Sequence, residues 1–143
     1  MRRLVSCMLA MLLAMMQVSV ATAAGPFRDV QGTLAQEILE AYEAGIVSGY
    51  GDGTFRPDEP VTRAAFAKMI VTAVEGAMGK ELPMGTEPFL DVDPGLALYP
   101  YVVKAYQAGY MKGYSDDTFG YAKAITRQEA AAILQRALNL QLR

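Results

Sequence analysis

Residues 41–55 read AYEAGIVSGYGDGTF, and 64 positions later residues 105–119 read AYQAGYMKGYSDDTF. Two further matches extend this similarity: residues 61–63 (VTR) with 125–127 (ITR), and residues 27–30 (FRDV) with 89–92 (FLDV). Self-similarity at a period of roughly 20–50 residues is typical of stacked supersecondary units, each too small to bury its apolar face alone. The sequence therefore predicts a tandem repeat, an architecture that usually binds other molecules and seldom catalyses.

Residues 1–23 have the layout of a secretory signal peptide. Two arginines precede an apolar run from Leu4 to Val20, and the run closes on Ala21-Thr22-Ala23, the small-x-small pattern of a cleavage site. We expect a mature chain that starts at Ala24 and no longer contains Cys7. The alternative is an uncleaved membrane anchor, although the run falls short of the ~20 apolar residues of a spanning helix.

The composition excludes several classes of function. The chain has no histidine and one cysteine, so disulfides, thiolate nucleophiles and zinc sites built on Cys or His are not expected. Acidic and basic residues are scattered, with a formal net charge of −2, which disfavours nucleic acid as a partner. A calcium loop around Asp52 fails because Tyr50 would have to be a ligand. We predict a protein without a metal or cofactor that is not an enzyme.

Hydrophobic periodicity predicts two helices per repeat and an all-α fold. In the first repeat Leu34, Ile38, Ala41 and Tyr42 form an apolar stripe that ends at Gly45, and residues 98–109 repeat this pattern. A second helix follows each of the N-caps Thr62 and Thr126, and Glu129 adds a capping box in the second repeat. The expected modules are residues 27–75 and 89–141, joined by a linker at 76–88 that is rich in Gly and Pro.

Arg63 and Arg127 each follow an N-cap threonine in the first turn of a predicted helix. The positive end of the helix dipole disfavours a cation there by about 0.3–1 kcal/mol, which suggests a compensating anion. From the residues alone, an internal carboxylate such as Asp29 or Asp91 is favoured. The alternative is an external carboxylate or phosphate that an arginine grips beside free helix N–H groups.

The tyrosines fall into two groups. Tyr42 and Tyr106 on the first helices are expected to be core residues. Tyr50 and Tyr114 in the loops fit a core position or the wall of a sugar-binding groove equally well.

The chain resembles the S-layer homology (SLH) module of bacterial cell-surface proteins in four successive features. These are Phe-x-Asp-Val, a helix ending Ala-Gly-Ile, the loop at 49–57 (GYGDGTFRP) and residues 61–64 (VTRA). The resemblance covers roughly 27–75 and 89–140. It implies a pseudo-threefold helical bundle, usually of three modules, that binds an anionic, often pyruvylated, wall polysaccharide. This chain departs from the pattern: it has no tryptophan, Asp117 replaces a loop glycine, Gly120-Tyr121 replaces Arg-Pro, and only two modules are present.

The resemblance reverses the preference for Arg63 and Arg127, because the arginine of the family's Thr-Arg-Ala-Glu motif contacts the acidic group of the ligand. The predicted ligand-binding residues are Arg63, Gly49, Tyr50, Asp52, Gly53 and Thr54 in module 1, and Arg127, Gly113, Tyr114, Asp116 and Thr118 in module 2.

The expected function is anchoring of a secreted protein at the cell wall or envelope through an acidic glycopolymer. The alternative is an assembly module that pairs with a further copy of itself or with a third SLH module from another chain.

Overall fold

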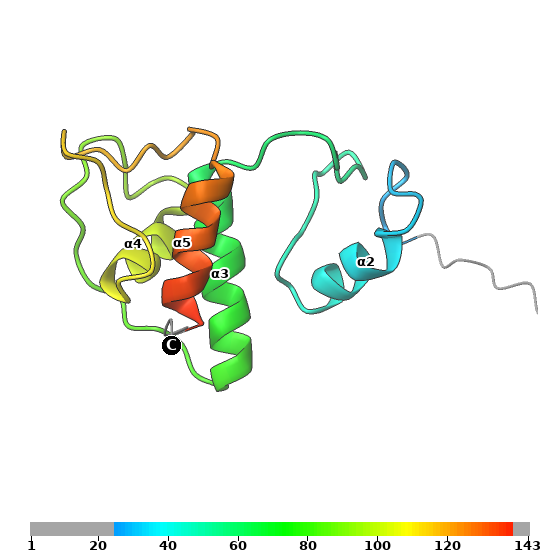
Figure 1. Ribbon diagram of the computed structural model, residues 1–143, viewed down its shortest axis with the longest axis horizontal. Coiled ribbons are helices and arrows are strands. Elements are labelled where there is room, and N and C mark those ends of the chain that lie inside the picture. The colour runs from blue at the N-terminus through cyan, green and yellow to red at the C-terminus, as the bar shows by residue number, and fades with distance from the viewer. Residues whose placement is uncertain (1–24, 139–143) are drawn as a thin grey trace, which may run out of the picture.

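The computed structural model describes residues 25–138, which form four helices joined by long loops (Figure 1). Their bounds are α2 Ala35–Glu43, α3 Arg63–Met78, α4 Tyr99–Gln107 and α5 Arg127–Ala137. No strand forms in this range, apart from one isolated antiparallel bridge between Thr62 and Ala124. The all-α expectation is confirmed. The pseudo-threefold bundle stays a prediction.

The predicted signal peptide at 1–23 lies outside the described residues. Within residues 25–138, no helix combines the length and apolar character needed to cross a bilayer.

The helix boundaries follow from local chemistry. Oγ1 of Thr62 accepts the N–H of Ala65 at 3.2 Å, and Thr126 forms the complete capping box with Glu129. Gly45 and Gly109 follow the first helices at φ of 72° and 73°, a conformation that costs glycine little. Helix α3 continues three residues into the expected linker and ends at Met78, where Gly79 at φ 61° terminates it.

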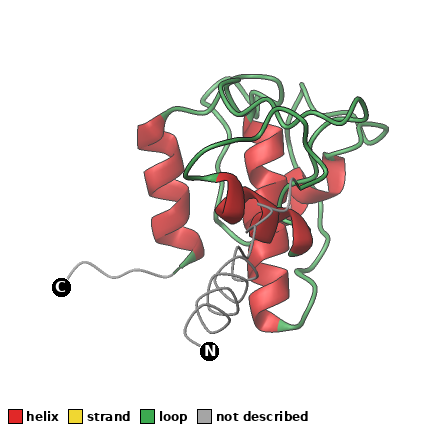
Figure 2. Cartoon of the chain, turned by 90° about the vertical axis from the view of Figure 1, so that its right-hand side faces the viewer, coloured by secondary structure: helices red, strands yellow, loops and turns green. Residues whose placement is uncertain are grey.

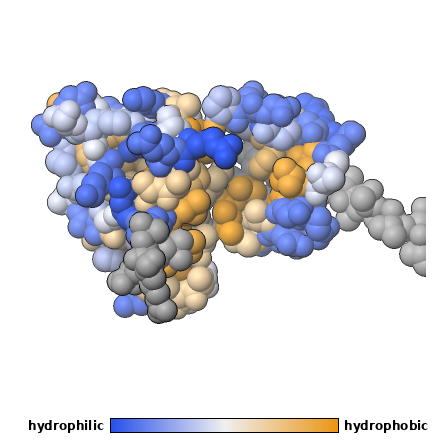
Figure 3. All heavy atoms as spheres, in the orientation of Figure 1, coloured by the Kyte–Doolittle hydropathy of each residue, from blue (hydrophilic) through white to orange (hydrophobic). Residues whose placement is uncertain are grey.

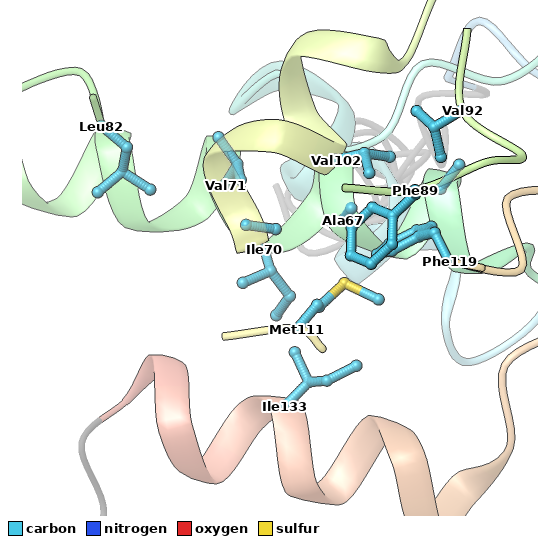
Figure 4. Packing of buried hydrophobic residues seen from close by; sticks show 12 residues of the cluster. Ala67, Ile70, Val71, Leu82, Phe89, Val92, Val102, Met111, Phe119 and Ile133 are labelled. Carbon is cyan, nitrogen blue, oxygen red and sulfur yellow. The ribbon is translucent and has the colours of Figure 1, made fainter. Parts of the chain in front are cut away.

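One hydrophobic core joins the second helix of module 1 to module 2. Helix α3 packs against α4 and α5. The side chains that fill this core come from α3, α4, α5 and the loops of module 2 (Figure 4), among them Val71, Val102, Met111, Phe119 and Ile133. Lys104 on α4 also pairs with Glu75 on α3 at 2.7 Å. The core of module 2 therefore includes the second helix of module 1.

Helix α2 lies apart from this core (Figure 1). It packs against no other helix of residues 25–138 and contains no buried residue. It contributes Tyr42 to a small aromatic cluster with Phe27 and Phe55. The centre of the Phe27 ring lies 5.2 Å from the ring centres of both Tyr42 and Phe55. The apolar stripe predicted for this helix is thus only partly covered. Figure 3 shows a hollow between the α2 side and the α3–α5 side, with hydrophobic residues on both walls.

Candidate binding surfaces at the loop end of the modules

The loops gather at one end of the helices (Figure 2), and their polar residues mostly bond to one another. Asp52 accepts the N–H of Thr54 at 3.0 Å and its hydroxyl at 2.6 Å, and Asp116 holds Thr118 in the same way. These contacts lower the pKa of Asp52 and Asp116, chiefly through the threonine hydroxyls. Four of the predicted ligand residues therefore shape the loops, and their direct contact with a ligand stays a prediction.

The repeated Phe-x-Asp-Val segments clamp the loops from outside. Asp29 accepts the N–H groups of Phe55 and Arg56, both at 2.8 Å, and Asp91 accepts those of Phe119, Gly120 and Tyr121 at 2.6, 2.8 and 3.0 Å. Neither carboxylate forms an ion pair with Arg63 or Arg127. The residues alone had favoured Asp29 or Asp91 as the internal partner of the two arginines, and this choice of carboxylates is therefore wrong.

Two of the loop glycines have no room for a side chain. A Cβ on Gly49 would collide with the Phe27 ring and lie 2.8 Å from the Thr54 carbonyl oxygen. One on Gly113 would meet Phe89 and lie 2.9 Å from the Thr118 oxygen. Both glycines let the loop close over the phenylalanine of its own module.

Arg63 crosses from module 1 into module 2 and is 4 % exposed. Its Nε donates to the Phe119 carbonyl at 2.8 Å, Nη2 to the Lys112 carbonyl at 2.8 Å and Nη1 to Glu129 Oε1 at 3.0 Å. The guanidinium carbon lies 4.7 Å from the centre of the Tyr114 ring. An internal carboxylate does compensate this arginine, but that carboxylate is Glu129, the capping-box residue of the other module.

Glu129 is the centre of this junction. Its Oε1 also accepts the Tyr114 hydroxyl at 2.8 Å, while Oε2 accepts the N–H of Thr126 at 2.9 Å. The Thr126 N–H, the Tyr114 and Thr126 hydroxyls and the charge of Arg63 outweigh partial burial and lower the pKa of Glu129 to about 2. The carboxylate is therefore ionised at any physiological pH.

The first turns of α3 and α5 differ in whether their N–H groups have hydrogen-bond acceptors. In α3, Arg63 N–H donates to the Lys123 carbonyl at 2.8 Å, Ala64 N–H to the Tyr121 carbonyl at 3.2 Å and Ala65 N–H to Thr62. The free helix N–H groups expected beside Arg63 are thus already occupied. In α5, the Arg127 side chain is exposed, and within residues 25–138 neither it nor the N–H groups of Arg127 and Gln128 have a partner.

Equivalent pockets open in the two modules. The module 1 pocket, of about 380 Å³, is lined by Gly49 and Tyr50 together with Ile46, Val47, Ser48, Phe55, Arg56, Pro57, Glu59, Pro60, Val61, Thr62, Ala65, Lys68, Met69 and Leu98. The module 2 pocket, of about 240 Å³, is lined by Gly113, Tyr114 and Arg63 together with Lys112, Gln128, Glu129, Ala132, Ile133 and Arg136. Arg127, Asp52, Gly53, Thr54, Asp116 and Thr118 line neither pocket.

Arg56 and Lys68 are two cations of the module 1 pocket that were not among the predicted ligand-binding residues. The Arg56 guanidinium lies 3.9 Å from the centre of the Tyr50 ring, and Lys68 Nζ donates to Ser48 Oγ at 2.8 Å. At the position equivalent to Arg56, module 2 has Gly120, where an added Cβ would lie 2.8 Å from Tyr114 and 3.4 Å from Cδ of Arg63. The loss of Arg-Pro in the second loop thus makes room for Arg63.

These features define a class of protein: a repeat of helix–loop–helix modules whose pockets lie at the loop ends and whose neighbours share one core. The S-layer homology domain model matches residues 26–67 and 88–131, and the chain belongs to this family.

The chain is 33 % identical over 127 residues to cell surface glycoprotein 1 of Acetivibrio thermocellus, which covers 83 % of this chain and 6 % of that protein. It is 34 % identical over 118 residues to the cellulosome-anchoring protein of the same organism, covering 79 % and 26 % of the two chains. An endoglucanase from a Bacillus species is 34 % identical over 116 residues, which make up 79 % of this chain and 12 % of the enzyme. The match thus spans a small part of each of these relatives.

Proposed function

We propose that this protein anchors itself, and whatever it is attached to, at the bacterial cell wall or envelope by binding an acidic wall polysaccharide, without catalysis. Its family and its similarity to a cellulosome-anchoring protein and a cell surface glycoprotein support a surface location. The endoglucanase match covers only 12 % of that enzyme, so it gives no reason to assign hydrolysis to this chain.

The module 1 pocket is the observation that carries the proposal. It has the size of a site for one or two sugar rings, since ligand pockets commonly measure roughly 300–1,000 Å³. Arg56 and Lys68 place two cations in its wall against one carboxylate, that of Glu59. The partly exposed Tyr50, with Met69 and Leu98, offers apolar surface to a sugar face.

The arginine that meets the acidic group is Arg56 in this proposal. Arg56 lies near the end of the glycine-rich loop, and its side chain is 39 % exposed. Within the described residues its guanidinium bonds only to Asp52, Thr54 and Glu59, none of which is buried. A ligand carboxylate can therefore replace Asp52 or Glu59 as the partner of Arg56 at little cost in free energy, because surface ion pairs contribute only about 0–1 kcal/mol. Arg63, by contrast, already has three buried or half-buried acceptors.

Binding to purified wall sacculi tests the proposal. The mature protein should sediment with sacculi and lose that binding after mild acid has removed the secondary polymers. Equal binding to both preparations, or to neither, would contradict it.

The second candidate is assembly with another protein chain that carries the same kind of module. The exposed Arg127 and the incompletely covered helix α2 favour it. Among residues 25–138 neither has the inter-module partners that its repeat equivalent, Arg63 or α4, has. Light scattering on the mature protein, alone and with such a chain, distinguishes the two candidates.

A further inference from the structure

We propose that Glu59 occupies the place of the ligand's acid group in the module 1 pocket, and that this internal carboxylate limits the affinity of the pocket for an acidic polymer. The inference rests on the proposed function and deepens it, because it assigns an affinity-determining residue to the same site. It also names which of the two carboxylates beside Arg56 the ligand displaces.

The guanidinium of Arg56 is divided between the loop and the pocket. Its Nε donates to Oγ1 of Thr54 at 3.2 Å, and its Nη2 donates to Oδ2 of Asp52 at 3.3 Å. Nη1 makes no hydrogen bond within residues 25–138. Oε2 of Glu59 lies 3.6 Å from Nη1, which is an ion pair beyond hydrogen-bond distance. Nη1 is therefore the group that an incoming acid can bind.

The two carboxylates beside Arg56 differ in position. Glu59 lines the pocket together with Arg56 and Lys68, whereas Asp52 does not. Asp52 also accepts the N–H and the hydroxyl of Thr54, so it shapes the loop in a way that a ligand cannot replace. The side chain of Glu59 is 55 % exposed, and Arg56 is its one ion-pair partner in the described part of the chain. An acidic ligand thus displaces Glu59 more readily than Asp52.

The loop holds Arg56 in place independently of Glu59. The N–H of Arg56 donates to Asp29 at 2.8 Å, and its backbone is left-handed at φ 59°. Its guanidinium carbon lies 3.9 Å from the centre of the Tyr50 ring. Loss of the Glu59 charge should therefore leave the guanidinium at the pocket wall.

A turn carries Glu59 to this position, and module 2 has the same turn with the opposite charge. The N–H of Glu59 donates to the Arg56 carbonyl at 3.1 Å, and the N–H of Lys123 donates to the Gly120 carbonyl at 2.9 Å. Lys123 thus stands where module 1 has Glu59, and its Nζ lies 4.4 Å from the centre of the Tyr114 ring. Because the turn forms with either charge at its last residue, the Glu59 carboxylate is not needed to build it.

A carboxylate at this place opposes an anionic ligand in two ways. The ligand has to break the ion pair between Arg56 and Glu59, and the displaced Glu59 stays on the pocket wall as a like charge. Single charge pairs at exposed sites are weak and change an affinity by up to about fivefold. The natural protein should therefore bind about two- to fivefold more weakly than a protein without this charge.

Glu59→Gln tests the proposal, because it removes the charge at nearly the same shape. Isothermal titration with solubilised wall polymer should show about two- to fivefold tighter binding than that of the natural protein. The gain should shrink at about 1 M salt, where charges are strongly screened. Asp58→Asn is the matched control, since it removes the neighbouring exposed charge, which does not line the pocket. It should leave the affinity nearly unchanged.

Glu59→Lys is the second variant, with the residue that the same turn carries in module 2. It should bind at least as tightly as Glu59→Gln, and urea unfolding of both variants should stay close to that of the natural protein. Tighter binding separates this role from a structural one, because loss of a supporting contact would weaken binding.

The proposal is overturned if neither variant at Glu59 binds more tightly than the natural protein while Arg56→Ala still lowers the affinity. It is also overturned if Asp58→Asn gains as much as Glu59→Gln, since the effect is then one of general charge. If Arg56→Ala and Lys68→Ala both keep the natural affinity, the pocket is not the binding site, and the proposed function loses its site together with this inference.

Discussion

Nη1 of Arg63 lies 3.0 Å from Oε1 of Glu129, so the first turn of one repeat is neutralised by the first turn of the next. The side chains are 5 % and 26 % exposed. A pair in this environment stabilises only when its remaining donors and acceptors are satisfied. Here the carbonyls of Phe119 and Lys112 and the hydroxyl of Tyr114 satisfy them.

Arg63→Ala should destabilise the protein, whereas Arg127→Ala should not. Removing the guanidinium leaves Glu129 and two carbonyls without their donor, a loss on the order of 3 kcal/mol for a broken buried pair. Arg127 has no partner within the described residues to lose. Urea unfolding of both variants measures the difference, and equal free energies of unfolding would contradict the structural role of Arg63.

Gly49→Ala and Gly113→Ala should each disorder a loop. The new Cβ would collide with Phe27 or Phe89, which sit at the centre of an aromatic cluster, and Gly49 also has a φ of 61°. We expect a loss of about 1–3 kcal/mol, the range for overpacking. Gly51→Ala is the matched control in the same loop, since nothing lies within 4 Å of its Cβ position. A control that costs as much as Gly49→Ala would show that the collision is not the cause.

Acid should weaken the module junction. The pKa of Glu129 is lowered in the folded state from 4.5 to about 2, so its contribution to stability is complete above pH 4.5 and is lost as the pH falls toward 2. Glu129→Gln should be less stable than the natural protein at pH 7 and should depend less on pH between 4.5 and 2. Some dependence remains, because the pKa values of Asp29 and Asp91 are lowered too. Denaturation at a series of pH values measures both slopes, and identical slopes would exclude Glu129 as a source.

Arg56→Ala and Lys68→Ala should weaken binding to the acidic wall polymer without loss of fold. A charge-assisted contact is worth roughly 1.5–3 kcal/mol, so each variant should lose about tenfold or more in affinity. Arg28→Ala serves as the control for a general loss of positive charge. Isothermal titration with solubilised polymer measures the effect. Unchanged affinity in both variants, with circular dichroism intact, would show that the module 1 pocket is not the site.

Much of the fold could be predicted from the sequence because it depends on contacts between near neighbours in the chain. The stripe around Ile38, the caps Thr62 and Thr126, the capping box with Glu129 and the stop at Gly45 each involve residues within about one helical turn. The repeat itself defined the two modules. The end of α3 was predicted less well, because Gly76 stands inside the helix and the stop comes only at Gly79.

The tertiary structure decided the partners of the functional side chains. Arg63 and Arg127 occupy equivalent positions in the two repeats, so the sequence alone predicted the same role for both. Only the fold shows that Arg63 is buried in a contact with Glu129 of the other module, 66 residues further along the chain, whereas Arg127 is exposed. Likewise Arg56 and Lys68 share a pocket because a loop and a helix meet there. Local sequence determines helices and caps, because their hydrogen bonds close within a few residues. Which charges are neutralised, and which remain available to a ligand or partner, depends on which module lies next to them in space.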